Sequence, residues 1–393
     1  MLRCVLLFLL FLHLPSITTT AASPTTTTFN IVDFGAKADG KTDSAHPLLT
    51  AWSRACASRG SGTVIVPHGT FLLSKALLLG PCNNHNMLVD IQGTVVAPAS
   101  YTPALAWIML KLVDGVKVTG GKLDGFGQAL WRCKLAGKSC PVGATSLAVA
   151  GSRNVWINGL SSMNSELFHI SIYQSSGVRV TGARITAPMD SPNTDGIHIQ
   201  ESSFVTVFGA AVGTGDDCIS VGPGGSHIWI EHIKCGPGHG ISIGSLGWEA
   251  SEHGVWNVTA RDVEFAGTLN GFRIKSWAKP SNGFARDIVF EDGLMNNVKY
   301  PIIIDQNYCP AQNNCPSQTS GVKISNVKFR NVNGTSATQV AVKLDCSKRW
   351  PCVGIHLEDV RLRYNGNGRT VATCNNVHGG SAGVVAPPSC ISS

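Results

Sequence analysis

Charged residues are scarce in this chain of 393 residues, because Lys, Arg, Asp and Glu together make up only 14% of it. The net charge is +7, and the basic residues form no Lys/Arg blocks, which argues against a nucleic-acid-binding protein. The sequence has no C-x-x-C pair, no H-E-x-x-H motif and no glycine-rich phosphate-binding loop. These absences argue against zinc, redox and nucleotide chemistry. A mild basic excess remains compatible with an acidic substrate.

Long apolar stretches are also rare, and the clear example lies at the start of the chain. Residues 4–14 form an apolar run that is too short to cross a bilayer comfortably, with Arg3 before it and small residues around Ala21 after it. This pattern predicts a secretory signal peptide over residues 1–22, with a signal anchor as the alternative. The mature chain, residues 23–393, would then be one secreted domain without contact to a membrane.

The cysteine count fits an extracellular protein. Of 13 cysteines, Cys4 would leave with the signal peptide, and the remaining 12 form an even set that can be fully paired. Pairing between sequence neighbours is the simplest scheme, although other pairings satisfy the same count. The sequons at Asn257 and Asn333 could carry glycans in a secreted chain. The expected disulfides are Cys56–Cys82, Cys133–Cys140, Cys218–Cys235, Cys309–Cys315, Cys346–Cys352 and Cys374–Cys390.

Three short segments that carry titratable side chains recur at one fixed spacing. They contain Asp195, Asp217 and His239, and the two intervals are equal, 217 − 195 = 22 and 239 − 217 = 22 residues. A repeat of about 20–50 residues is typical of a solenoid. In a parallel β-helix, equivalent residues lie on adjacent coils about 4.8 Å apart, so these side chains should share one face, with Asp216 beside them. Each segment is followed by an apolar–polar–apolar triplet: Ile197-His198-Ile199, Ile219-Ser220-Val221 and Ile241-Ser242-Ile243.

A second series of short strands interleaves with this one. Segments such as Val155-Trp156-Ile157 and Val178-Arg179-Val180 have the apolar–x–apolar pattern of a half-buried strand, and they recur every 23 to 27 residues. Two strand series per coil predict an all-β, single-domain parallel β-helix. Residues 43–58 have helical spacing and predict a short helix that caps the N-terminal end of the stack. Residues 376–393 are rich in Gly, Pro and Ser and are expected to form a loose tail that is tied by Cys390.

Four motifs stand in order between residues 193 and 275. Together they resemble the signature motifs of the polygalacturonases, glycoside hydrolase family 28, and the opening string at residues 29–36 resembles plant members. The likeness is strongest over residues 155–308. It implies a right-handed parallel β-helix that hydrolyses pectic polygalacturonate with inversion, without a metal or another cofactor. The motifs are Asn193-Thr194-Asp195-Gly196, Gly215-Asp216-Asp217, Gly238-His239-Gly240 and Arg273-Ile274-Lys275.

The residue types fit this chemistry. Glycoside hydrolysis needs a carboxylic acid that protonates the leaving oxygen and a carboxylate that activates water. By the resemblance, Asp216 is the general acid, and Asp195 and Asp217 hold and activate the water. His239 would tune the proton on Asp216.

Substrate contacts are expected from four further residues. Arg273 and Lys275 flank one apolar residue and therefore face the same side of a strand. Two facing cations repel each other unless an anion lies between them, and a galacturonate carboxylate suits that role. Asn193 and Tyr308 complete the expected substrate contacts. A role in the turn for Asn193 and a core position for Tyr308 are the alternatives.

The sequence therefore predicts a secreted, monomeric hydrolase of polygalacturonate that acts on the cell wall, in an endo mode or alternatively an exo mode. A Ca²⁺-dependent pectate lyase also uses this fold, and the acidic ladder offers oxygen ligands for Ca²⁺. His239 and the pair of Arg273 and Lys275 match the hydrolases instead. A non-catalytic wall-binding β-helix is the third reading, and the presence of all three aspartates argues against it.

Overall fold

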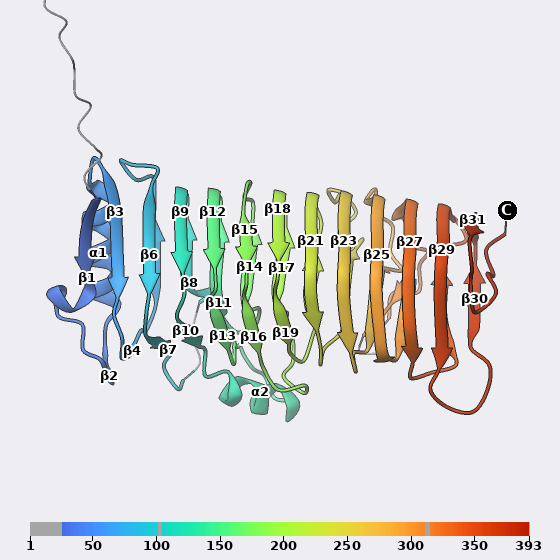
Figure 1. The fold of residues 1–393 in the computed structure, drawn as a ribbon, viewed down its shortest axis with the longest axis horizontal. Helices are drawn as coiled ribbons and strands as arrows, with labels where there is room; N and C mark the ends of the chain where they lie inside the picture. The colour runs from blue at the N-terminus through green and yellow to red at the C-terminus, as the bar shows by residue number, and fades with distance from the viewer. Residues whose placement is uncertain (1–25, 101–103, 311–314, 393) are drawn as a thin grey trace, which may run out of the picture.

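The molecule is built from parallel β-strands stacked along one axis (Figure 1). The computed structural model describes residues 26–100, 104–310 and 315–392. The strands form two sheets that run the length of the stack, and the chain passes from one sheet to the other in each coil. This arrangement is the all-β parallel β-helix that the sequence predicts.

The smaller sheet has 11 strands and contains the strands that follow the catalytic-type motifs. Its members β17, β20 and β22 are direct neighbours, one coil apart. In chain order it consists of β5 (Ala76–Leu79), β8 (Ala106–Lys111), β11 (Thr145–Ala150), β14 (Ile170–Tyr173), β17 (Ile197–Gln200), β20 (Ile219–Val221), β22 (Ile241–Leu246), β24 (Asn270–Trp277), β26 (Tyr300–Tyr308), β28 (Val340–Asp345) and β30 (Val371–Asn375).

The larger sheet has 20 strands in two arms that join at β21. One arm consists of β1 (Thr26–Asn30), β3 (Ser61–Val66), β6 (Met87–Ile91), β9 (Asp114–Thr119), β12 (Arg153–Asn158), β15 (Arg179–Thr181), β18 (Ser203–Phe208), β21 (Ser226–Cys235), β23 (Val255–Ala266), β25 (Phe284–Val298), β27 (Lys323–Ser336), β29 (Cys352–Tyr364) and β31 (Val377–Ala382). The other consists of β2 (Asp39–Asp43), β4 (Thr70–Leu72), β7 (Thr94–Val96), β10 (Lys122–Asp124), β13 (Ser161–Met163), β16 (Arg184–Thr186) and β19 (Ala211–Gly213).

The expectation of two strands per coil is wrong for many coils, because they contain a third strand, which belongs to the second arm of the larger sheet. In the earlier coils a glycine with positive φ, such as Gly182 at φ 62° or Gly209 at φ 66°, turns the chain between the two arms. In the later coils Asp262, Asp292 and Asn331 take the same left-handed conformation, with φ of 50° to 52°. Asp and Asn tolerate this region, so the chain bends there within one long strand.

The core is a column of aligned apolar side chains inside the coils. Ile197, Ile219 and Ile241 are neighbours in register, and each is 0% exposed. Farther along the stack, Phe290 lies between Phe272 at 4.8 Å and Phe329 at 5.3 Å, measured between ring centroids. Each coil thus buries much of its apolar face against the neighbouring coils, as is typical of solenoid packing.

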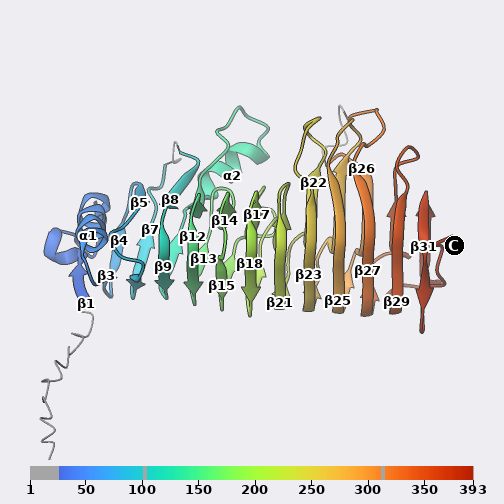
Figure 2. The ribbon, with the colours of Figure 1, turned by 90° about the horizontal axis from the view of Figure 1, so that it is seen from above.

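The N-terminal end is closed by a helix, as predicted for residues 43–58. Helix α1 (Ala45–Ala57) follows the short 3-10 helix η1 (Ile31–Phe34) and packs on β1, β3 and β5. Its buried face includes Leu48 and Trp52, and the Trp52 indole donates a hydrogen bond to the carbonyl of Leu79 at 3.0 Å. The second helix, α2 (Gln128–Leu135), projects on the side of β14 and β17 (Figure 2).

The prediction of a loose C-terminal tail is wrong. Part of that segment forms β31, which pairs in parallel with β29 and adds a last strand to the larger sheet. The absence of a side chain at Gly379 lets β31 approach β29 closely, because a Cβ on Gly379 would lie 1.9 Å from the carbonyl oxygen of Ile355. Pairing with β31 gives partners to backbone hydrogen-bonding groups along that edge of β29, which explains why a Gly-rich sequence is ordered there.

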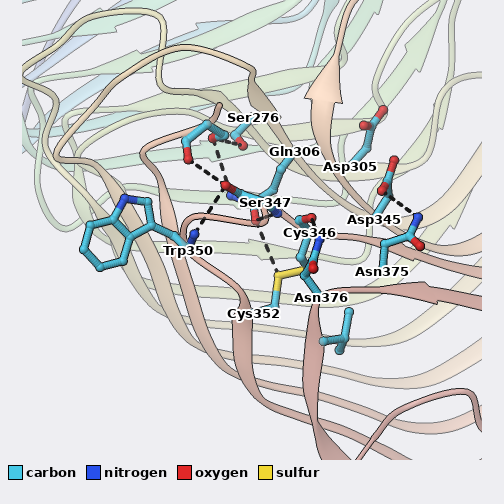
Figure 3. Close-up of a disulfide and its surroundings, with 12 residues drawn as sticks. Ser276, Asp305, Gln306, Asp345, Cys346, Ser347, Trp350, Cys352, Asn375 and Asn376 are labelled. Atoms are coloured by element: carbon cyan, nitrogen blue, oxygen red, sulfur yellow. Dashed lines mark hydrogen bonds between the residues drawn. A yellow bond between two sulfur atoms is a disulfide. The ribbon is translucent and has the colours of Figure 1, made fainter. Parts of the chain in front are cut away.

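All six predicted disulfides are present, and they contain the 12 cysteines from Cys56 to Cys390. The Cys346–Cys352 disulfide lies beside a buried polar network (Figure 3). In this network the side chain of Gln306 donates to the carbonyl of Val322 at 2.8 Å and accepts from the backbone of Ser347 at 2.8 Å. Buried amide groups therefore find partners at the C-terminal end of the stack.

The predicted signal peptide, residues 1–22, lies outside the described residues, and the division at residue 22 stays a prediction. Within the part of the chain that the structure describes, neither helix has the length and apolar character needed to span a membrane.

Candidate active site

The 22-residue spacing corresponds to one coil of the stack, so the titratable residues form a ladder. Register pairs join Ile197 to Ile219 and Ile219 to Ile241, which brings the preceding coil segments side by side. Backbone hydrogen bonds continue this alignment into the motifs, since the amide of Gly196 donates to the carbonyl of Asp217 at 2.9 Å. The ladder lies on the outer side of the 11-stranded sheet.

Asp217 is the most enclosed of the three carboxylates, with a side chain that is 0% exposed. Its two oxygens accept from Arg273 Nη2 at 2.5 Å and from Lys275 Nζ at 2.8 Å. Ser242 Oγ donates a third hydrogen bond at 2.8 Å. Burial alone would raise the pKa of Asp217, but the charges of Arg273 and Lys275 outweigh it and lower that pKa to about 2. Asp217 is therefore an anion throughout the ordinary pH range.

This contact changes the interpretation of Arg273 and Lys275. The sequence predicts a substrate carboxylate between the two cations, whereas the structure places the carboxylate of Asp217 there. Each cation is only 6% exposed, so the pair belongs first to the architecture of the site. Two cations and one carboxylate leave one formal positive charge, which can still attract an acidic sugar.

Asp195 has the opposite electrostatic environment. It is 7% exposed, and its Oδ2 accepts a hydrogen bond from Ser220 Oγ at 2.6 Å. Burial and the nearby charges of Asp216 and Asp217 raise the pKa of Asp195 well above its usual range, and Lys275 offsets only part of this effect. The site thus holds one carboxyl group of lowered pKa, Asp217, and one of raised pKa, Asp195.

Asp216 and His239 form the more accessible side of the ladder. His239 Nδ1 lies 3.1 Å from Asp216 Oδ1, as the predicted tuning of Asp216 requires. The Asp217 backbone amide donates to the same oxygen at 2.8 Å. The side chains of Asp216 and His239 are 19% and 35% exposed, so both are more accessible than Asp217.

The glycines around His239 allow this close packing. A Cβ on Gly240, which has φ of 90°, would lie 2.2 Å from the carbonyl oxygen of Asn270. The Asn270 side chain in turn donates to the carbonyl of His239 at 2.9 Å. These contacts fix the backbone position of His239.

Three residues of the site were not singled out in the sequence, although a signal was present. His198, Ser220 and Ser242 are the polar middle residues of the three apolar–polar–apolar triplets, and all face the ladder. His198 Nδ1 lies 2.8 Å from Ser220 Oγ, and its ring stacks on Phe168 at 4.3 Å. Burial lowers the pKa of His198, which favours the neutral imidazole.

The two remaining predicted contact residues, Tyr308 and Asn193, have different surroundings in the structure. Tyr308 is half-buried, and the centre of its ring lies 5.1 Å from Lys275 Nζ. The Trp277 ring meets it edge-on at 5.1 Å. Asn193, in contrast, occupies an exposed turn with φ of 60°. The structure thus brings Tyr308 to the ladder and gives Asn193 a turn conformation that also leaves its side chain accessible.

Two hollows adjoin the ladder from opposite sides. One has a volume of about 620 Å³ and is lined by Phe168, His198 and Trp248 among others. The other has a volume of about 400 Å³ and is lined by His239 and Lys299 among others. A chain-like ligand could therefore extend past the catalytic groups in both directions.

The donor set does not fit the Ca²⁺ site of the lyase alternative. Ligand atoms of Asp216, Asp217 and His239 lie within 4.8 Å of one another. Both oxygens of Asp217 are already bound by Arg273 and Lys275, whose charges oppose a divalent cation. Ca²⁺ also prefers six to eight oxygen ligands, more than this group supplies.

Comparison with known proteins gives a consistent result. The family model described as "Glycosyl hydrolases family 28" matches residues 56–389. The chain is 52% identical over 374 residues to a polygalacturonase of Prunus persica, with 94% of each chain covered. It is 39% identical over 355 residues to an exopolygalacturonase of Platanus acerifolia, covering 89% of this chain and 94% of that protein.

A solved structure agrees with the fold. The endo-xylogalacturonan hydrolase from Aspergillus tubingensis superimposes with a TM-score of 0.77 at 23% identity, covering 91% of this chain and all of that one. The likeness confirms the right-handed parallel β-helix.

Proposed function

The chain belongs to glycosyl hydrolases family 28, and we propose that it is a polygalacturonase, which hydrolyses the α-1,4 bonds between galacturonosyl residues of pectin. The 52% identity to a plant polygalacturonase over nearly the whole chain supports this substrate. The observation that carries the proposal is the ladder of three aspartates, in which Arg273 and Lys275 hold the buried carboxylate of Asp217 and the more exposed Asp216 lies 3.1 Å from His239. Glycoside hydrolysis requires one carboxylate that activates water and one carboxylic acid that donates a proton.

Asp217 supplies the negative charge that activates water. Its pKa of about 2 keeps it ionised, and Arg273 and Lys275 hold both of its oxygens in place. Asp195 lies one coil away and helps to position the same water, as the resemblance to the family implies. Direct attack by this water, without a covalent intermediate, inverts the anomeric carbon.

Asp216 delivers the proton to the leaving oxygen. Among the three aspartates it has the largest side-chain exposure, 19% against 10% for Asp195 and 0% for Asp217, so it can reach a bond that lies in the cleft. His239, at 3.1 Å, is positioned to orient the Asp216 carboxyl group and to influence its proton.

We also assign an endo mode of action. The hollows on both sides of the ladder leave room for sugar residues before and after the cleaved bond. Relatives named polygalacturonase and relatives named exopolygalacturonase both match the chain, so the mode rests on the shape of the cleft.

Secretion to the cell wall and action as a monomer are parts of the same proposal. The 12 described cysteines from Cys56 to Cys390 are all in disulfides, and such a disulfide content is typical of an oxidising, extracellular environment. The bound partner in that location is the pectic polysaccharide.

Proton NMR during the first minutes of hydrolysis of polygalacturonate tests the reaction. We expect new reducing ends with the inverted anomer, and activity that survives excess EDTA. An ultraviolet-absorbing unsaturated product would indicate a lyase, and a retained anomer would contradict direct attack by water.

A further inference from the structure

The outer surface of the larger sheet carries a hollow that lies away from the ladder. It has a volume of about 480 Å³ and is lined by residues of β12, β15, β18 and β21 and of the segments next to them. Figure 2 shows these strands in the layer opposite β14 and β17. Gly177 creates the space, because it lies between Asn154 on one coil and Phe204 on the next and has no side chain.

Aromatic side chains flank this hollow. Trp156 is 40% exposed and Phe204 is 60% exposed, although both are large apolar residues. The Trp156 indole is held by a hydrogen bond from Nε1 to Thr181 Oγ1 at 2.7 Å. The ring of Phe204 stacks on His227 at 4.6 Å. Exposed rings that are fixed in this way can pack against the C–H face of a sugar at little cost in side-chain entropy.

One basic side chain, Arg179, lines the hollow, and a second, Lys117, lies next to its wall. Lys117, Trp156 and Arg179 are neighbours in register on β9, β12 and β15, so Trp156 lies between two cations. Lys117 Nζ is 4.2 Å from the centre of the Trp156 ring. Neither Lys117 nor Arg179 forms an ion pair with any residue in the described ranges. Asn154, which lines the hollow, donates a hydrogen bond to the carboxylate of Asp114 at 2.7 Å.

We propose that this hollow is a second binding site for an acidic polysaccharide, on the opposite side of the β-helix from the catalytic ladder. Arg179 would bind a uronate carboxylate, while Trp156 and Phe204 would pack against the sugar rings. The choice of polygalacturonate as the ligand rests on the proposed function. A polymer segment held there would keep the enzyme on the wall while the cleft acts on another segment, which raises avidity.

The test uses the full chain carrying Asp216→Asn, so that the polymer is not cut during the measurement. We expect the added pair Trp156→Ala and Arg179→Ala to weaken binding to immobilised polygalacturonate about tenfold, equivalent to about 1.4 kcal/mol. The matched control is Trp350→Ala with Arg184→Ala. Trp350 is 38% exposed and lies 4.6 Å from Lys323 Nζ, which reproduces the environment of Trp156 away from the hollow.

Each outcome decides the proposal. A loss confined to the Trp156 and Arg179 pair, and absent on fully methyl-esterified pectin, supports it. Equal binding by both double variants, or an equal loss on esterified pectin, overturns the assignment of an acidic ligand. Unfolding midpoints check the fold, and Arg179→Gln alone replaces the pair if that variant unfolds. Failure of the wild type to hydrolyse polygalacturonate would contradict the proposed function, while the binding comparison would still test the hollow.

Discussion

At the scale of single residues, the contact between Lys275 and Asp217 should determine how kcat/KM depends on pH. Removal of Lys275 takes away one of the charges that lower the pKa of Asp217, so that pKa should rise. The acid limb of kcat/KM against pH should then move to higher pH in Lys275→Ala, with a loss of about one to two orders of magnitude near neutrality. Lys234→Ala, which removes an exposed lysine from β21, should keep the wild-type profile. An unshifted acid limb in Lys275→Ala would contradict the role given to this contact.

The raised pKa of Asp195 predicts a gain in stability when its charge is removed. The folded state binds this proton more tightly than the unfolded state does, so stability falls as pH rises above the ordinary value of 3.8. Asp195→Asn keeps an acceptor for Ser220 and removes the carboxyl group whose proton binding differs between the folded and unfolded states. It should therefore raise the free energy of unfolding by about 0.5–2 kcal/mol at neutral pH, and show no gain below pH 3.8. Denaturant titrations at the two pH values measure this difference, and equal effects at both would contradict the assigned cause.

The division of roles between Asp216 and Asp195 can be tested with leaving groups. Asp216→Asn cannot donate a proton, so it should lose about 10²–10⁴-fold in turnover on polygalacturonate. A galacturonide with a leaving group that needs no proton should recover most of that rate. Asp195→Asn should lose activity on both substrates, because attack by water is impaired in each case. The reverse pattern would assign the acid to Asp195.

Which residues form the site could be predicted from the sequence, but their partners could not. The equal spacing and the motifs identified Asp195, Asp217 and His239, since one coil of a stack has a nearly constant length. The contacts of Asp217 with Arg273 and Lys275 bridge 56 and 58 residues across coils of different length. No periodicity in the sequence links residues at such distances, and so the anion between the two cations was assigned to the substrate.

At the scale of elements, the aromatic column inside the later coils should be a main source of stability. Phe290 is 0% exposed and stacks on Phe272 and Phe329. Phe290→Ala should lower the free energy of unfolding by about 3–5 kcal/mol, because it removes transfer energy and leaves a cavity between two coils. Val289→Ala, at the adjacent position that points outward, should cost far less. Denaturant unfolding followed by circular dichroism makes the comparison, and similar costs would argue against the column.

The strands differ in how well the sequence predicts them. Those with alternating Val and Ile were predictable, because burial on one face imposes period two. The three-residue strands β13, β16 and β19 are shorter than any pattern that periodicity can detect. The sequence of β31 predicts a loose tail, because its glycines resemble those of a linker. In the structure these glycines let β31 lie close to β29.

At the scale of the whole molecule, the cleft is expected to work on the interior of a polymer. Because hollows adjoin the ladder on both sides, early digestion of polygalacturonate should yield a range of intermediate oligomers and a rapid fall in viscosity. Chromatography of products at less than a few per cent hydrolysis measures this directly. Release of galacturonate monomer alone from the first minutes would show that one end of the cleft is closed, and would assign the exo mode.

The contacts of Asp217 have a consequence for when this enzyme becomes active. Its carboxylate comes from the coil of β20, and its two cations arrive on β24, two strands later in the stack. Until β24 docks on β22, Asp217 is an unpaired aspartate with neither its depressed pKa nor its fixed orientation. A chain that has folded only as far as β22 is therefore expected to be inactive. Hydrolytic activity should appear only when β24 has paired with β22 and its two cations contact Asp217.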